Sequence, residues 1–389
     1  MDKIQKDLIS SLKNRIYNIP IKLSDNTDWD TLLRLSEKAQ ILPMIYDAIK
    51  ASNLNIPEDV ETKYTQKLIM SATIDAQQEF HIQQLISVFN ENNIDFSLLK
   101  GASIKKLYSN SFYRCMGDID ILIRTEQYSE IKKIMLQLQY TEQKESVHEL
   151  IWTKPPFICI ELHKMLIPEY NSDFYAYYGN GWGKMNRYDG CMYRMTPEDE
   201  FIYLFTHFSK HYRDGGIGIR HLVDLRVYMN HYSLDERYVV DELKSLHLER
   251  FYKNIVDTIN VWFDEGKETT ETTIITNTIF HSGSYGNAEK FDYANALRTT
   301  KHYTNTFMAK VAYITKLIFL PLSSMKKRYP LLNKFTFLLP IFWCIRWGDV
   351  LINNRNRIKI QSDRAKRICE KDVDSYENEL DAVGLNYYF

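Results

Sequence analysis

The sequence predicts an α+β fold in which a small mixed β-sheet lies between N-terminal and C-terminal helical regions. Apolar residues recur at three- and four-residue intervals from Asp2 to about Asn92, which is the period of an amphipathic helix. Between residues 94 and 195 the pattern changes to short apolar runs bounded by glycine and proline, as in strands. Helical periodicity returns after residue 196. Since 44% of the 389 residues are hydrophobic, the chain can build a sizeable core.

The first 93 residues are expected to form a helical N-terminal region. The stretches WDTLLRLSEKAQILPMIYDAIKAS and KYTQKLIMSATIDAQQEFHIQQLISVFNENN both carry apolar residues at helical spacing. The second stretch has no strong breaker over its length. We therefore expect this region to end in one long helix that leads into the sheet.

Residues 94–195 are expected to form the α/β core. The predicted elements are a strand over 94–101, a helix over 102–109, a strand over 117–123, a helix over 126–139, and a hairpin of strands over 147–154 and 157–164. Thr125 is expected to cap the helix that follows it, because its hydroxyl can accept a hydrogen bond from a free backbone amide. The segment 165–195 is rich in Tyr, Gly and Asn and is expected to be an irregular connection.

Two further regions are predicted beyond the core. Residues 196–320 are expected to form a helical domain, which begins with Thr196 as N-cap and Pro197 in the first turn. The glycine cluster at 215–218 lacks the context of a dinucleotide fingerprint and is expected to be a turn between helices. Residues 321–389 are expected to form a basic and aromatic C-terminal helical segment.

The basic C-terminal tract has three interpretations. It can be a solvated helix face backed by a packed apolar side, a surface that meets anionic lipid, or a surface that meets a negatively charged acceptor. The first is the commonest for such a composition and is the one favoured here. Its basic residues, opposed only by Asp349 and Asp363, are Lys326, Lys327, Arg328, Lys334, Arg346, Arg355, Arg357, Lys359, Arg364, Lys366 and Arg367.

Charge and cysteine usage exclude some classes of protein. The net charge of −1 argues against a dedicated non-specific nucleic-acid binder, which would carry a broad basic excess. The five cysteines form no CxxC pair and no metal-finger spacing, which is typical of reduced thiols in a cytoplasmic protein. The N-terminal residues lack the apolar region of a signal peptide.

The stretch GDIDILI places two acids at the start of a buried strand. Asp118 and Asp120 are two residues apart, so their side chains point to the same face. Such a pair is often only an exposed strand or loop feature, but it is also a platform for Mg²⁺, which relieves the repulsion between carboxylates. Gly117 permits close backbone approach. Glu161, in the apolar strand ICIELH, is a third acid that needs a partner.

Three motifs carry a resemblance to a known family. The stretches LLKGASIKKLY, R-x-MGDIDILI and IELH resemble the nucleotidyltransferase family of the DNA polymerase β superfold, in its branch of uncharacterised bacterial nucleotidyltransferases. The resemblance is strongest over residues 94–164. It implies that Asp118 and Asp120 bind the metal ions and that Glu161 is the third ligand.

The resemblance also implies a nucleotide-binding turn. Lys100, Gly101 and Ser103 match the turn that holds the phosphates, and Arg114 would neutralise triphosphate charge. The usual turn reads Gly-Ser or Gly-Gly, whereas here Ala102 separates Gly101 from Ser103. This departure bears on the phosphate contact of Ser103 and leaves the carboxylates unaffected.

The activity implied by the resemblance is transfer of a nucleoside monophosphate from an NTP to an acceptor hydroxyl, with two Mg²⁺ (or Mn²⁺) ions. A small molecule or a protein is expected to be the acceptor. A nucleic-acid acceptor is disfavoured because the core lacks a basic stripe. The alternative is a catalytically silent nucleotide-binding or protein-interaction module on the same fold, against which the presence of all three acids argues.

A group of histidines is the remaining candidate. His207 and His211 are four residues apart and share a helix face. They can be hydrogen-bonded between helices, or they can line the nucleotide or acceptor cleft, as the resemblance favours. Arg220, His221 and Asp224 follow on the next helix and can join them; no spacing defines a zinc site. His163, on the same strand face as Glu161, is a possible proton carrier or a structural residue.

Overall fold

A computed structural model describes residues 1–24, 26–52, 54–283, 286–300, 315, 318–320, 322–353 and 370–387. The fold is α+β, with a seven-stranded mixed sheet and helices on either side of it in the sequence, as predicted. The chain divides into two compact units. The first comprises Met1–Tyr212, Gly216–Gly286 and Val383–Tyr388, and the second comprises Arg213–Gly215 and Asn287–Ala382 with the last residue.

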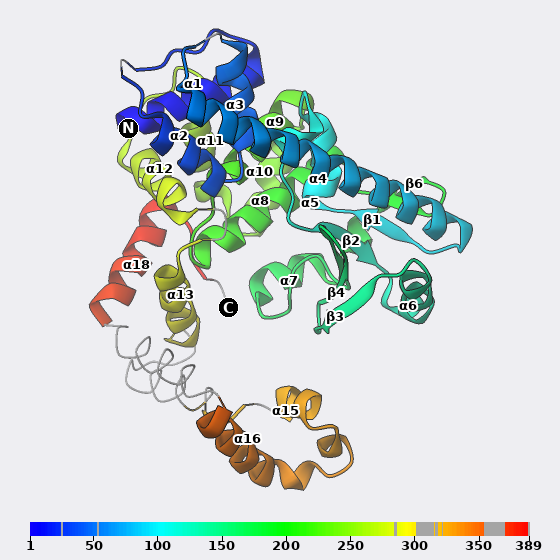
Figure 1. The fold of residues 1–389 in the computed structure, drawn as a ribbon. Coiled ribbons are helices and arrows are strands. Elements are labelled where there is room, and N and C mark those ends of the chain that lie inside the picture. The colour runs from blue at the N-terminus through cyan, green and yellow to red at the C-terminus, as the bar shows by residue number, and fades with distance from the viewer. Residues whose placement is uncertain are drawn as a thin grey trace. The chain divides into compact units, whose positions relative to one another are not determined.

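The N-terminal region is helical, as expected. It consists of α1 (Lys3–Tyr17), α2 (Trp29–Lys38), α3 (Leu42–Ala51) and α4 (Glu58–Glu91) (Figure 1). Asp2 starts α1 with a capping box, because its side chain accepts from the Gln5 amide and the Gln5 side chain accepts from the Asp2 amide. α4 is a single helix of 34 residues, and it ends just before the sheet begins.

The strands form one sheet with the order β3-β4-β5-β2-β1-β7-β6. Their bounds are β1 Phe96–Leu98, β2 Ile119–Ile123, β3 Thr141–Glu145, β4 Glu149–Lys154, β5 Ile158–His163, β6 Asn186–Asp189 and β7 Met192–Arg194. β2 lies between β1, to which it is antiparallel, and β5, to which it is parallel. The predicted hairpin is the antiparallel pair β4–β5. The central position of β2 places the residues at its start well inside the unit.

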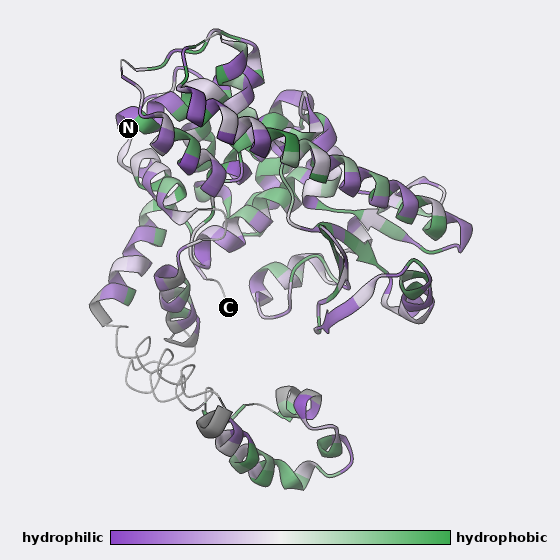
Figure 2. Cartoon of the chain, viewed as in Figure 1, coloured by the Kyte–Doolittle hydropathy of each residue, from purple (hydrophilic) through white to green (hydrophobic). Residues whose placement is uncertain are grey.

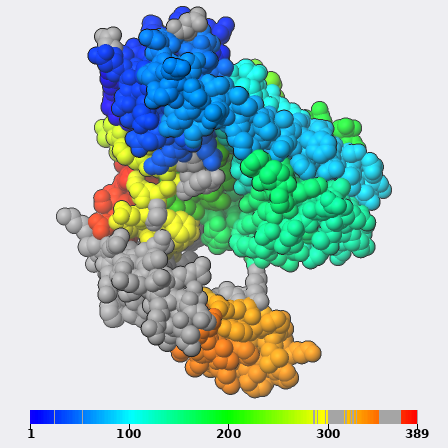
Figure 3. Space-filling view, viewed as in Figure 1, coloured from blue at the N-terminus to red at the C-terminus, as the bar shows by residue number. Residues whose placement is uncertain are grey.

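One face of the central strands packs into an apolar core. Ile119, Ile121, Ile160 and Leu162 are fully buried there. α4 and α6 (Tyr128–Gln137) contribute further members, which are Ile82, Leu85, Phe89, Ile131, Ile134 and Met135. The central strands are accordingly hydrophobic in Figure 2, and the space-filling view shows α4 directly against the sheet-bearing part of the unit (Figure 3). This packing anchors the strands that carry the acids.

The first unit also contains short helical turns between the strands and a helical part after the sheet. Short turns of helix follow β1 and precede β2: α5 (Lys100–Ile104), η1 (Lys105–Leu107) and η2 (Ser111–Tyr113). The helical part after the sheet contains α8 (Pro197–Arg213), α9 (Ile219–His231), α10 (Glu236–Ser245), α11 (Glu249–Phe263) and α12 (Thr270–Ser282). Thr196 caps α8 as predicted, since its hydroxyl accepts from the Asp199 amide at 3.1 Å. The glycine cluster lies in the turn between α8 and α9.

Two expectations for the core were wrong. Thr125 does not cap the following helix: it begins a 3₁₀ turn, η3 (Thr125–Gln127), and α6 starts after Gln127. The segment 165–195 is not wholly irregular, because it forms α7 (Ser172–Tyr178), η4 (Trp182–Lys184) and the strands β6 and β7. β7 forms a local antiparallel hairpin with β6 through the Gly190-Cys191 turn, and it also pairs with β1, almost a hundred positions earlier in the chain. The glycine turn is a local signal for the hairpin, but no local pattern gives the pairing with β1.

The second unit contains α13 (Ala288–Thr300), α15 (Leu322–Arg328), α16 (Leu339–Asn353) and α18 (Glu370–Val383), with the 3₁₀ turns η5 (Pro330–Asn333) and η6 (Thr336–Leu338). Six of the basic residues predicted to mark the C-terminal segment, Arg355 to Arg367, lie outside the described residues. No helix in the described part of the chain combines the length and the apolar character that crossing a membrane requires. Cys115, Cys159, Cys191 and Cys344 are free thiols.

Candidate active site

Successive side chains of a strand point to opposite faces of the sheet, and in β2 and β5 the polar side chains share one of these faces. In the parallel pairing, Asp120 lies opposite Glu161 and Leu122 lies opposite His163. Residues that pair across strands share a face, as do residues two apart along a strand. Asp120, Glu161 and His163 therefore lie on the face opposite the apolar core. Asp118, two residues before Asp120, directly precedes β2.

Asp120 is the most buried of the acids, with 5% of its surface exposed. Its Oδ1 atom accepts from the Lys100 ammonium at 2.7 Å and from His163 Nε2 at 2.6 Å. Burial alone would raise the pKa of Asp120, but Lys100 and His163 outweigh it and hold this pKa well below its usual range. Burial, together with the charge of Lys100, lowers the pKa of His163, so this imidazole is neutral and donates from Nε2.

The pKa values of the other two acids, Asp118 and Glu161, are raised, whereas that of Asp120 is lowered. Burial raises the pKa of Asp118, and the charge of Asp120 raises it further. Burial and the charges of Asp118 and Asp120 raise the pKa of Glu161 to about 7. Three negative groups thus compete for too few positive partners.

The donor atoms on this face suit a divalent cation. One ligand atom each from Asp120, Glu161 and His163 lies within 4.8 Å of the others. Carboxylate oxygens are the ligands that Mg²⁺ and Mn²⁺ prefer, whereas the Nε2 atom of His163 is engaged with Asp120, and a cation would remove the repulsion that burial otherwise intensifies. Asp118 is on the same face but outside this closely spaced group.

A cavity of about 340 Å³ opens over the acids. The sheet forms one wall, and α8 and α9 form the other. The residues that α8 contributes are Leu204, His207, Phe208, Lys210 and His211, and those from α9 include Arg220, His221 and Asp224. The acidic face of the sheet therefore forms one side of the cavity, and histidines and basic side chains of α8 and α9 form the opposite side.

The histidines of that wall lie close together. The ring centroids of His207 and His211 are 4.4 Å apart, and those of His207 and His221 are 6.4 Å apart. Burial lowers the pKa of all three well below the usual value, and neighbouring positive charges lower it further. These rings are therefore neutral, and they line the cavity without adding charge.

Arg114 lines the cavity but is held in a buried ion pair. Its Nε atom donates to Asp224 Oδ1 at 2.7 Å, and Tyr108 donates to the same oxygen at 2.6 Å. A second guanidinium nitrogen donates to the Cys115 carbonyl. Burial opposes the charge of Arg114, but Asp224 outweighs it and raises the pKa of the guanidinium. This pair joins α9 to the chain that immediately precedes Asp118.

The turn after β1 is built by close packing. A Cβ atom on Gly101 would lie 2.8 Å from Met116 Sδ and 3.0 Å from Met116 Cγ, so a side chain there would require the Met116 side chain to move. Lys100 adopts a φ of +48°, in the left-handed region, and its side chain reaches Asp120. Ser103 does not line the cavity, because its hydroxyl donates to the buried carboxyl of Glu200. Gly117 lines the cavity directly.

Some cavity residues were not foreseen from the sequence. Glu149 lies on β4 opposite His163, and Lys210 extends from α8. The hairpin register, read from the two strands and the Pro155-Pro156 turn, could have identified Glu149. Nothing in the sequence pairs Arg114 with Asp224, since 110 residues separate them.

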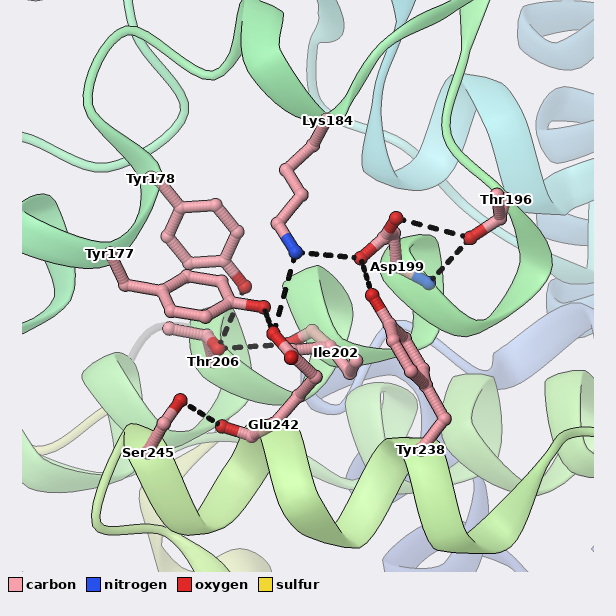
Figure 4. Close-up of polar contacts among 10 residues, drawn as sticks. All are labelled: Tyr177, Tyr178, Lys184, Thr196, Asp199, Ile202, Thr206, Tyr238, Glu242 and Ser245. Atoms are coloured by element: carbon pink, nitrogen blue, oxygen red, sulfur yellow. Dashed lines mark hydrogen bonds and ion pairs between the residues drawn. The ribbon is translucent and has the colours of Figure 1, made fainter.

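A second polar cluster joins the segment after β5 to the helices α8 and α10 (Figure 4). Lys184 of η4 lies 3.0 Å from Asp199 Oδ1 of α8 and 3.4 Å from Glu242 Oε2 of α10. Tyr238 donates to the same Asp199 oxygen, and Tyr177 of α7 donates to Glu242. Since Leu166, Pro168 and Tyr170 just upstream line the cavity, this cluster holds their segment against the helical part.

The comparisons with known proteins agree with this geometry. The model of a family described as uncharacterised nucleotidyltransferase matches residues 25–264, which is more than half of the chain and contains every residue of the acidic face. A search of curated proteins and a search of solved structures each found no match. The chain belongs to this family of uncharacterised nucleotidyltransferases.

Proposed function

We propose that the protein transfers a nucleoside monophosphate from an NTP to an acceptor hydroxyl, with divalent cations held by Asp118, Asp120 and Glu161. The convergence of these acids from two parallel strands onto one cavity-facing surface carries the proposal. Family membership supports the reaction class. In the reaction, the acceptor oxygen bonds to the α-phosphorus as the bond to the β-phosphate breaks; pyrophosphate leaves, and the hydroxyl proton passes to water.

The donor set supports Mg²⁺ or Mn²⁺ as the metal. Bound there, such ions would neutralise triphosphate charge and acidify the attacking hydroxyl. Asp120 and Glu161 lie side by side in the strand register, and Asp118 is one alternation before Asp120. Burial, and then the charges of the neighbouring carboxylates, raise the pKa of Asp118 and Glu161, and a cation would relieve the repulsion among these carboxylates.

The protein's own side chains would orient the nucleotide and the acids. The ammonium of Lys100, at the turn after β1, donates to Asp120. When a cation binds Asp120 in place of this ammonium, Lys100 would be free to donate to a phosphate oxygen of the nucleotide. His163 would keep the Asp120 carboxylate in position through its Nε2 hydrogen bond. Lys210 and Arg220 bring positive charge to the opposite wall, and neutral His207 and His211 lie beside them.

The acceptor class follows from charge. The residues outside 318–369, which include every residue that lines the cavity, carry a net charge of −10, so no broad positive field recruits a nucleic acid to the cavity. Side chains enclose the cavity on both the sheet side and the helix side. A small-molecule hydroxyl or a single protein side chain fits these properties.

Labelled-nucleotide transfer tests the proposal. The purified protein is incubated with Mg²⁺, each α-labelled NTP and a cell extract, and the molecule that gains label is identified. We expect transfer by the native protein and none by Asp118→Asn/Asp120→Asn. Asp189→Asn, which removes an exposed acid of β6 in the same sheet, is the matched control and should be fully active.

Calorimetry separates the enzyme from a silent binding module. Magnesium-dependent NTP binding without label transfer to any molecule would contradict the enzymatic proposal and leave nucleotide binding as the function. Equal NTP binding by the native protein and the double variant would contradict the metal site itself.

A further inference from the structure

A stripe of exposed apolar side chains runs along η6 and α16 in the second unit. The exposed fractions are 74% for Phe337, 56% for Ile341 and 49% for Ile345. Their spacing of four residues places Ile341 and Ile345 on one side of α16, and Phe337 continues the row. Cys344, between them, is also exposed. Figure 2 shows the hydrophobic residues along this helix.

The opposite side of α16 is packed. The indole nitrogens of Trp343 and Trp347 each donate at 2.9 Å, to the carbonyls of Leu320 and Ile318. The Phe319 ring lies 5.0 Å from the Trp343 ring and 5.2 Å from the Trp347 ring. The stripe is therefore the outer side of an ordered, packed helix.

The sequence around the stripe is strongly basic. Between residues 318 and 369, eleven Lys and Arg residues stand against two Asp residues, a net charge of +9. Since the whole chain carries −1, the other residues together carry −10. Within the described part, Lys334 is exposed in the turn between η5 and η6, next to the stripe. An exposed positive residue and exposed apolar residues thus follow one another along the chain from Lys334 to Ile345.

We propose that the outer side of η6 and α16, formed by Lys334, Phe337, Ile341 and Ile345, binds the surface of an anionic lipid bilayer. Aliphatic and aromatic side chains partition into the boundary between headgroups and acyl chains, and the basic residues are attracted by the anionic headgroups. A nucleic acid would satisfy the charge but offers little to Ile341 and Ile345. A second copy of this surface would satisfy the stripe but bring two positive surfaces together.

Vesicle sedimentation tests the proposal. The full-length protein is mixed with vesicles of phosphatidylcholine alone or of phosphatidylcholine with phosphatidylglycerol. We expect binding to the anionic vesicles, weakened by high salt, and little binding to the neutral ones. Phe337→Ser/Ile341→Ser/Ile345→Ser should weaken binding at least about tenfold, because each substitution removes apolar area that the bilayer would bury. Lys334→Glu should weaken it about fivefold or more.

A matched control uses exposed apolar residues elsewhere. Ile69 and Phe80 on α4 are 62% and 64% exposed, so Ile69→Ser/Phe80→Ser removes comparable apolar surface from the first unit. This variant should bind vesicles like the native protein, and circular dichroism should show both sets of variants folded. A polarity-sensitive dye on Cys344, in a Cys115→Ser/Cys159→Ser/Cys369→Ser background that removes the half-buried thiols as well, reports insertion independently through a blue shift on anionic vesicles only.

Three outcomes would overturn the proposal. The first is equal vesicle binding by the native protein and the stripe variant, or no native binding to anionic vesicles at low salt. The second is stripe-dependent binding to DNA or RNA that is as tight as binding to vesicles. The third is self-association that the stripe variant abolishes, without any vesicle binding. None of these results bears on nucleotidyl transfer, which is measured separately.

Discussion

The two faces of β2 and β5 place opposite demands on the same strands. On one face Ile119, Ile121, Ile160 and Leu162 pack against α4 and α6 and are fully buried. On the other, Asp120 and Glu161 lie side by side with Asp118 close in sequence, and each negative charge raises the free-energy cost of ionising the others. Alternating residues of one strand thus separate a face that stabilises the fold from a face that strains it.

The difference shows where the free energy for the acidic face comes from. Fully burying a large aliphatic side chain contributes about 1.5–3 kcal/mol, so the apolar side can hold the strands in register against local repulsion. Lys100 and His163 make their hydrogen bonds to Asp120, and they offset the charges of Asp118 and Glu161 only in part. The pKa of Glu161 stays raised, as is expected of a carboxyl group in a metal site before a cation binds.

The largest expected effect breaks the acidic face. Asp120→Asn should lower nucleotidyl transfer at least about a thousandfold, because the central cation ligand is lost. Its free energy of unfolding should also fall, by roughly 3 kcal/mol, because Lys100 loses its buried anionic partner, but the molecules that remain folded should still transfer no label. Label transfer and urea unfolding measured on the same preparation check this pair of expectations. Transfer at native rates would remove Asp120 from the proposed reaction.

The next effect breaks the apolar face. Ile121→Ala, one residue further along β2, should lower the free energy of unfolding by about 2–4 kcal/mol, since it leaves a cavity in the core. Activity per folded molecule should remain within about twofold of the native value. Denaturant titration and active-fraction assays measure the two quantities. A large loss of activity in the folded variant would mean that the faces are not independent.

A smaller effect sharpens the electrostatic side of the comparison. Glu161→Gln removes one of the repelling charges, so it should stabilise the metal-free protein by about 1 kcal/mol, a figure reduced for its partial exposure to water. The same variant should lose most of the stabilisation that Mg²⁺ gives the native protein. Thermal unfolding with EDTA and with Mg²⁺ provides both numbers. Destabilisation without metal would show that Glu161 is satisfied by the protein alone.

The smallest effect concerns the turn beside the acids. Ser103→Ala should cost about 1 kcal/mol of stability, because Glu200 loses one of its hydrogen-bond donors and keeps the one from Tyr228. The KM for the NTP should change less than about twofold, since the Ser103 hydroxyl is directed to Glu200 rather than the cavity. Steady-state kinetics over a range of NTP concentrations tests this. A rise in KM of tenfold or more would return Ser103 to the phosphate-binding turn.

Much of the fold could be read from the sequence because its signals are local. The long helix α4, the hairpin β4–β5 and the start of α8 at Thr196 each follow from periodicity, turn residues or capping. The hairpin β6–β7 was missed although Gly190 marks its turn, whereas its attachment to β1 joins distant residues and could not be predicted. Thr125 was a suitable cap by residue type, but the chain makes a 3₁₀ turn there and starts the helix later.

The sequence by itself determined that Asp118 and Asp120 share a face and that the motifs around them are those of a nucleotidyltransferase, because strand alternation and motif spacing are properties of the chain alone. Only the tertiary structure decided that Glu161 lies beside Asp120, that Lys100 and His163 hold Asp120, and that Arg114 is occupied by Asp224. These contacts depend on which strands pair and how α9 packs. Their free energies come from burial and charge shared between distant segments, which no local pattern encodes.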